Sequence, residues 1–136
     1  MITKIDIPIY NTSVTVLVEI DEFQLKNFYN NNKQLLTEKE YNDLIEDIFK
    51  NKYPGLTLET DSHDYLIYLK NGASDNIVPH EIFHVCNKTL LNRNVSFDND
   101  AEAWAYLIGW FTEEYYRRYW KFKDDNSKIE TNHDNY

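Results

Sequence analysis

The alternation of apolar and polar residues predicts three β-strands. Residues 3–9 and 13–20 are rich in β-branched side chains, and a short polar turn separates them, so we expect a β-hairpin. Pro8 lacks a backbone donor, which predicts that the first strand lies at a sheet edge. Residues 64–70 alternate again and predict a third strand, whereas Pro54-Gly55 is typical of a turn.

Apolar residues at three- and four-residue spacing predict helices around these strands. Residues 21–30 form a short helix with Asp21 as its N-cap. Residues 38–50 are predicted to form a second helix, and this prediction is better supported because Thr37 and Glu40 have the spacing of a capping box. With two later helices, the pattern predicts an α+β fold in which a small antiparallel or mixed sheet packs on three to four helices.

The two later helices follow the third strand. The first begins near Asp75 or Asn76, either of which can cap it. The second runs from about residue 100 to about residue 122. We expect a single domain over residues 1–122 and a polar, frayed C-terminal tail over residues 123–136, because the tail shows no apolar periodicity.

The length and the net charge of the chain limit the kinds of protein that it can be. The 136 residues, of which 42% are hydrophobic, suffice for one domain with its own core. The net charge of −9 argues against nucleic acid or an anionic membrane as a partner. Cys86 is the single cysteine, which excludes an internal disulfide, and no apolar run reaches the length of a membrane span. We expect a cytoplasmic protein; residue usage typical of an AT-rich genome is compatible with a phage protein in the host cytoplasm or the virion.

The segment His80-Glu81-Ile82-Phe83-His84 spells H-E-x-x-H on the helix predicted to end near Leu91. Positions four apart lie about 40° apart around a helix axis, so His80 and His84 share a face and can bind one zinc ion. Glu81 lies about 100° from His80, where a carboxylate can deprotonate a zinc-bound water. The motif predicts a zinc-dependent hydrolase, and among hydrolases it favours a metallopeptidase.

A catalytic zinc usually has a third protein ligand, and Glu102 in the first turn of the last helix is the best candidate. Asp98 and Asp100 compete with it, although both are also ordinary helix N-caps. Ala105 and Gly109 share a helix face with Glu102, and their small size predicts that this face packs closely on the motif helix. The sequence therefore predicts a metal held between two neighbouring helices.

The motif, followed by Glu102-Ala103-Trp104-Ala105-Tyr106, resembles the gluzincin branch of zinc metallopeptidases. It is similar in particular to small phage-associated and ImmA/IrrE-type members, and the resemblance covers residues 63–112. One position departs from the larger secreted members, which carry an aspartate where this chain has Tyr106. A different group must then orient the histidines.

The resemblance implies a zincin-like fold with a defined set of site residues. His80, His84 and Glu102 would bind zinc, and Glu81 would be the general base. A peptide or protein substrate would add in extended form to the strand at 64–70, which would be the edge strand above the cleft. The resemblance thus implies an enzyme that hydrolyses peptide bonds.

Other interpretations stay open from the residues alone. The zinc could be structural, or the chain could be a non-catalytic binding protein or a phage virion-associated structural protein on a zincin-like scaffold. Cys86 points away from the two histidines, which predicts a buried apolar role. Aromatic side chains in the last helix indicate core or oligomer contacts, and the oligomeric state is left open. These residues are Trp110, Phe111, Tyr115, Tyr119 and Trp120.

Overall fold

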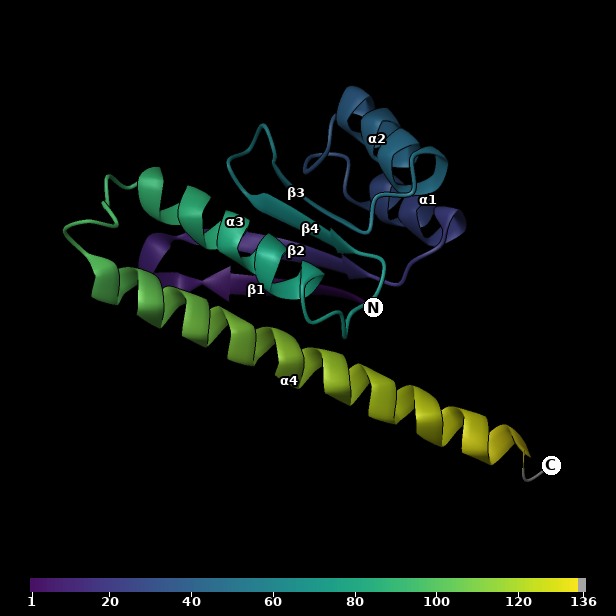
Figure 1. The fold of residues 1–136 in the computed structure, drawn as a ribbon. Helices are drawn as coiled ribbons and strands as arrows, with labels where there is room; N and C mark the ends of the chain where they lie inside the picture. The colour runs from purple at the N-terminus through teal and green to yellow at the C-terminus, as the bar shows by residue number, and fades with distance from the viewer. Residues whose placement is uncertain (135–136) are drawn as a thin grey trace.

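The computed structural model describes the backbone of residues 1–134 and the side chains of residues 1–128. Within these limits the chain has an α+β fold, in which helices cover both faces of a small mixed sheet (Figure 1). The strands are β1 (Ile2–Ile7), β2 (Thr12–Val18), β3 (Gly55–Glu59) and β4 (Tyr65–Leu69). The α-helices are α1 (Glu22–Asn31), α2 (Glu38–Ile45), α3 (Ile77–Leu91) and α4 (Ala101–Asp134). The predicted combination of a small sheet with helices is confirmed.

The strands follow the order β1-β2-β4-β3 across the sheet. β1 pairs with β2 and β3 pairs with β4 in antiparallel fashion, while β2 and β4 run parallel with Val14 opposite Tyr65. The predicted hairpin and the edge position of β1 are confirmed. The prediction that residues 64–70 form an edge strand is wrong, because β4 is paired on both sides. The second edge is β3, which begins at Gly55, where a turn was predicted.

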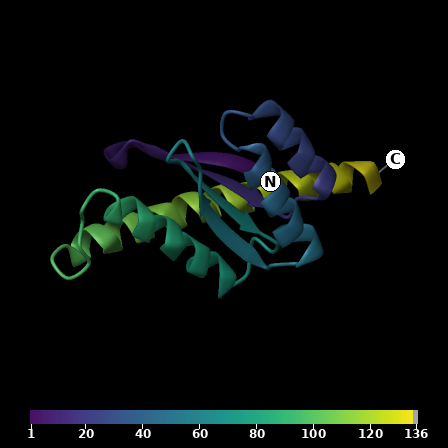
Figure 2. The ribbon, with the colours of Figure 1, turned by 90° about the horizontal axis from the view of Figure 1, so that it is seen from above.

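The two faces of the sheet bury different side chains, because successive residues of a strand point to opposite faces. Val16 and Ile67 belong to the core that includes residues of α3 and α4. Leu17 and Leu66 belong to the core that includes residues of α1 and α2. Figures 1 and 2 show the two pairs of helices on opposite sides of the sheet. The motif helix therefore lies in the layer formed by α3 and α4.

The N-termini of α1 and α2 are fixed by their own side chains. Asp21 accepts from the backbone N–H of Gln24, whose side chain accepts from Asp21 in return. Thr37 and Glu40 form the same reciprocal pair at α2. Both capping boxes satisfy N–H groups that a helix start leaves without partners, so the predicted starts are confirmed. A π-type turn at Glu46–Lys50 extends α2.

The C-terminal helix is longer than the sequence pattern indicated. The predicted end near residue 122 is wrong, because α4 continues to Asp134; residues 135–136 lie outside the described part of the chain. Neither glycine nor proline occurs after Gly109, and Lys128 forms an ion pair of 3.0 Å with Asp124 one turn earlier. Figure 1 shows the C-terminal part of α4 extending beyond the sheet.

Among residues 1–134, no helix combines the length and the apolar character that a membrane span requires.

Candidate metal centre

His80 and His84 project from one face of α3, one turn apart, as the motif predicts. Their Nε2 atoms are 3.0 Å apart, and their rings are inclined by 79° with centroids 4.6 Å apart. The side chain of His80 is 62% exposed, so the pair opens to solvent. Two neutral imidazoles at this distance can share a hydrogen bond when their tautomers are complementary. The same arrangement brings together two nitrogens that could both bind one metal ion.

The geometry of the histidine pair fits a shared zinc ion. Zinc bound tetrahedrally at about 2.0–2.1 Å from each nitrogen separates the two nitrogens by about 3.3 Å. A small movement of either ring would widen the observed separation of 3.0 Å to that value. Imidazole is also a preferred ligand of zinc. His80 and His84 can therefore hold zinc without a change in the backbone of α3.

The carboxylate of Glu81 is buried directly beside the histidine pair. Its Oε2 accepts a hydrogen bond of 2.5 Å from the hydroxyl of Thr57, and its Oε1 lies 3.9 Å from Nε2 of His80. Within the described residues, His80 is the one titratable side chain that lies within 4.0 Å of this carboxylate. A buried carboxylate is costly unless a cation or several donors compensate it. A metal ion on the histidine pair would supply that positive charge.

Gly55 allows β3 to approach the motif helix closely. A Cβ atom at this position would lie 2.6 Å from Cγ2 of Ile77 and 3.1 Å from Cγ of Glu81. Non-bonded carbon atoms normally stay about 3.5–4.0 Å apart, so only glycine fits here without movement of a neighbour. The close approach places Thr57, two residues further along β3, within hydrogen-bond distance of Glu81.

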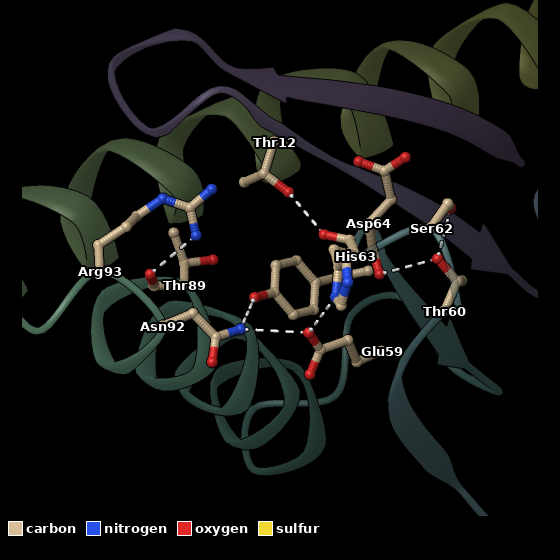
Figure 3. Close-up of polar contacts among 10 residues, drawn as sticks. Thr12, Glu59, Thr60, Ser62, His63, Asp64, Thr89, Asn92 and Arg93 are labelled. Atoms are coloured by element: carbon tan, nitrogen blue, oxygen red, sulfur yellow. Dashed lines mark hydrogen bonds and ion pairs between the residues drawn. The ribbon is translucent and has the colours of Figure 1, made fainter.

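The other end of β3 is tied to the end of α3 by polar side chains (Figure 3). The side-chain amide of Asn92 donates to Oε1 of Glu59 at 3.2 Å and to the hydroxyl of Tyr65 at 2.7 Å. Nδ1 of His63 lies 3.5 Å from the same Glu59 oxygen, and its side chain is 86% exposed. Together with the contact between Thr57 and Glu81, these bonds fix the edge strand against the motif helix at two points.

The loop that leads into α3 is held by β2 and α4. The hydroxyl of Tyr115 donates to the backbone carbonyl of Gly72 at 2.6 Å, and the Gly72 N–H donates to Glu19. Tyr119 and Lys123 also donate to the Glu19 carboxylate. Burial alone would raise the pKa of Glu19, but these hydrogen bonds outweigh it and lower the pKa below its ordinary value. The start of the motif helix is thus anchored by groups outside the candidate metal centre.

The face of α3 opposite the histidines lies in the core, as predicted. Val85 and Cys86 are fully buried. Burial raises the pKa of the Cys86 thiol to about 12, so the thiol stays protonated and unreactive at neutral pH. Cys86 therefore has a packing role.

An aromatic surface lies next to His84. The ring of Phe83 is 6.3 Å from the ring of His84 and 6.1 Å from that of Trp104, and Phe97 packs edge-on against Trp104 at 5.5 Å. Phe83 and Phe97 are 47% and 60% exposed, whereas Trp104 is buried. An apolar side chain of a ligand could therefore contact Phe83 and Phe97 beside the histidine pair.

The structure places Glu102 at the start of α4 with an exposed side chain. Phe111, which is fully buried, lies nine positions later and so about 180° around the helix from Glu102. Residues 1–128 contain no group of three histidine, cysteine, aspartate or glutamate side chains arranged around a common metal position. The structure thus brings His80, His84 and Glu81 together and does not join Glu102 to them.

The predicted packing of Ala105 and Gly109 against the motif helix is wrong. Both residues are exposed, and a Cβ at Gly109 would meet no atom within 4 Å. The larger apolar side chains of α4 occupy the core instead, since they bury more surface than a small-residue face would. They are Trp104, Leu107, Phe111, Tyr115 and Tyr119.

The sequence interpretation missed Thr57 and Gly55 as residues of the site. A usable signal was present, because Leu56-Thr57-Leu58-Glu59 alternates apolar and polar residues as a half-buried strand does. Leu56 and Leu58 pack on the core of α1 and α2, which turns Thr57 and Glu59 toward α3.

No protein-family model matches this chain, and no curated protein or solved structure matches it. The function is therefore inferred from the geometry of the candidate metal centre.

Proposed function

We propose that this chain is a zinc-dependent hydrolase that cleaves peptide bonds, with His80 and His84 as metal ligands and Glu81 as general base. One observation carries the proposal: two imidazole nitrogens 3.0 Å apart lie beside a buried carboxylate whose Oε1 is 3.9 Å from the nearer nitrogen. A solvated helix face would not need to bury Glu81. The combination matches the positions that the H-E-x-x-H spacing assigns to metal and base.

The roles of the side chains follow from their contacts. Zinc on the histidine pair would act as a Lewis acid toward a carbonyl oxygen and would lower the pKa of a coordinated water. Thr57 donates to Oε2 of Glu81, which leaves Oε1 as the oxygen directed toward the histidines. We assign to Oε1 the proton taken from the attacking water and returned to the leaving nitrogen. Thr57 is then a positioning residue.

The edge strand supports a peptide as the substrate. β3 pairs with β4 on one side and has no strand on its other side within the described chain. An extended peptide can hydrogen-bond to such a free edge, as in other cases of strand addition. Thr57 and Glu59 fix this edge beside α3, so a peptide added there would pass the histidine pair.

No contact joins Glu102 to the histidines. Its assignment as the third ligand therefore rests only on its position in the sequence. Its role is tested separately from that of the pair. If Glu102 binds zinc, Glu102→Ala weakens zinc binding, whereas the nearby Asp98→Ala does not. If both variants retain zinc as the wild type does, the assignment of Glu102 is wrong and that of the histidines is unaffected.

The first experiment measures zinc in the purified protein. We expect about one zinc ion per chain in the wild type. His84→Ala should lose most of this zinc, because the single remaining histidine provides too few ligands to hold the ion. His63→Ala is the matched control, since His63 is an exposed histidine outside the pair and should leave the zinc content unchanged. Equal zinc content in His84→Ala and the wild type would overturn the metal assignment.

The second experiment measures hydrolysis of an extended peptide library, with a chelator-treated sample as control. Glu81→Gln should keep zinc and lose about 10²- to 10⁴-fold in cleavage rate, because an amide cannot accept the proton. The cleavage should also stop when zinc is removed and return when zinc is restored. Wild-type turnover by Glu81→Gln would refute the role of Glu81.

A second candidate is a non-catalytic metal-binding protein. The outward position of Glu102 favours it, because a zinc held by two histidines alone has fewer protein ligands than catalytic sites usually have. This candidate predicts zinc binding that depends on His84 and no cleavage of any peptide in the library, so the second experiment separates the two.

A further inference from the structure

The face of α4 that points away from the sheet carries a row of exposed side chains, which we name the outer stripe. It consists of Tyr106, Trp110, Glu113, Arg117 and Trp120. The intervals of four, three, four and three residues are those of a coiled-coil seam, so the side chains lie in one line along the helix. Tyr106, Trp110 and Trp120 are 75%, 39% and 55% exposed. Large aromatic side chains in such a line are unusual on a surface that stays solvated.

An apolar groove adjoins the N-terminal half of the outer stripe. It lies between α4 and the short turn at Pro8–Tyr10, has a volume of about 510 Å³, and includes Tyr106 and Trp110 in its wall. Ile9, which also lines the groove, is 88% exposed. A cavity of this size and character can take an aromatic side chain from another molecule.

We propose that the outer stripe joins two copies of this chain through an antiparallel pair of α4 helices. A two-fold axis beside position 115 places Glu113 of each copy opposite Arg117 of the other, because both residues lie two positions from that point. The same axis places Trp120 of each copy opposite Trp110 and the groove, because both tryptophans lie five positions from it. One axis therefore pairs the charges and the aromatic residues at once.

The charges of the outer stripe are available for this pairing. Glu113 makes no hydrogen bond or ion pair among the described residues. Arg117 donates one N–H to Glu114 at 2.6 Å, and a guanidinium has further N–H donors. In an antiparallel pair the two Glu–Arg contacts are identical by symmetry. A self-complementary pattern of this kind favours a second copy over an unrelated partner.

The length of α4 supports the same occupant. Tyr119 is its last side chain in the core, and the helix continues to Asp134 past the sheet (Figures 1 and 2). A helical segment of about 12–15 residues is only marginally stable in water when nothing packs against it. In the antiparallel pair this segment would lie along the N-terminal part of the other α4, which supplies Tyr106 and the groove.

The proposal is tested by sedimentation equilibrium of the full chain over a wide concentration range at physiological salt. Charge reversals give the sharpest variants. Glu113→Arg and Arg117→Glu each create two like-charge contacts and should weaken the dimer at least about tenfold. The double variant Glu113→Arg/Arg117→Glu restores opposite charges and should recover most of the affinity. Asp43→Arg, an exposed change of equal charge on α2, is the matched control.

Trp120→Ser gives an independent variant, which should weaken the dimer at least about tenfold because the groove loses its occupant. Circular dichroism of each variant confirms that the exposed substitutions leave the fold intact. Recovery of the dimer in the double reversal, with loss in both single reversals, supports the antiparallel pair. The proposal is overturned if the wild type stays monomeric at all concentrations, or if the single charge reversals leave the dissociation constant of the dimer unchanged.

Discussion

Replacing Gly55 by alanine tests how closely β3 must approach the motif helix. The added methyl group would lie 2.6 Å from Cγ2 of Ile77, 3.1 Å from Cγ of Glu81 and 3.3 Å from the carbonyl oxygen of Tyr68. The Ile77 methyl sits on a β-branched carbon with one strongly preferred rotamer in a helix, so it cannot swing aside. The strand or the helix must therefore move.

The expected effect on stability is the balance of two terms. Overpacking of this kind costs about 1–3 kcal/mol. The loss of glycine flexibility in the unfolded chain returns about 0.4–1 kcal/mol. Gly55→Ala should therefore destabilise the protein by about 1.3 kcal/mol at the middle of both ranges, and by at most about 2.6 kcal/mol. Gly109→Ala is the matched control: its Cβ meets nothing within 4 Å in a helix interior, so it should stabilise the protein by about 0.5–1 kcal/mol.

Urea unfolding followed by tryptophan fluorescence measures both variants, with zinc affinity as a second readout. Because a shift of β3 also moves Thr57 away from Glu81, Gly55→Ala should bind zinc less tightly than the wild type, while Gly109→Ala should not differ. The reasoning is refuted if Gly55→Ala is as stable as Gly109→Ala with an unchanged urea dependence of the unfolding free energy.

Three further experiments test Thr57, Glu19 and Cys86. Thr57→Val keeps the side-chain shape but removes the only hydroxyl bonded to the buried Glu81 among the described residues; it should cost about 1.5–3 kcal/mol in urea unfolding, and an unchanged midpoint would contradict the contact. Glu19 has a folded-state pKa below its ordinary value of 4.5, so its stabilising effect is complete above pH 4.5 and disappears as the pH falls through the folded-state pKa. The difference in unfolding free energy between the wild type and Glu19→Gln should accordingly shrink below pH 4.5, and a constant difference down to the acid transition would argue against the lowered pKa. Cys86, whose pKa is raised to about 12, should resist alkylation at pH 8 in the folded protein and react fully in urea, and fast native labelling would contradict its burial.

The part of the site that lies within one helix could be predicted from the sequence. His80, Glu81 and His84 are close in the chain, so helical geometry alone fixes their relative positions. Thr57 and Gly55 come from a strand that precedes the motif by more than 20 residues, and no local rule brings them to Glu81. Their place depends on how the strands order themselves across the sheet.

The order of the strands across the sheet was the part of the fold that could not be predicted from the sequence. Pro54-Gly55 was interpreted as a turn, so the alternating residues that follow it were not assigned to a strand, and the edge position was assigned to residues 64–70. For α4, the sequence pattern presents two candidate faces for the core. The face of small residues with Glu102 was expected to pack inward, but the face with Phe111 buries more apolar surface and occupies the core.

The hydrogen bond from Tyr115 to Gly72 has a consequence for the order in which the protein is assembled. Translation produces the histidine-bearing segment well before α4, yet α4 supplies both the anchor of the preceding loop and much of the apolar surface that α3 rests on. A nascent chain that has emerged only as far as Leu91 thus lacks the apolar surface of α4 against which α3 packs. The zinc binding proposed above should accordingly be a late event in biosynthesis, delayed until the ribosome has released the residues around Tyr115.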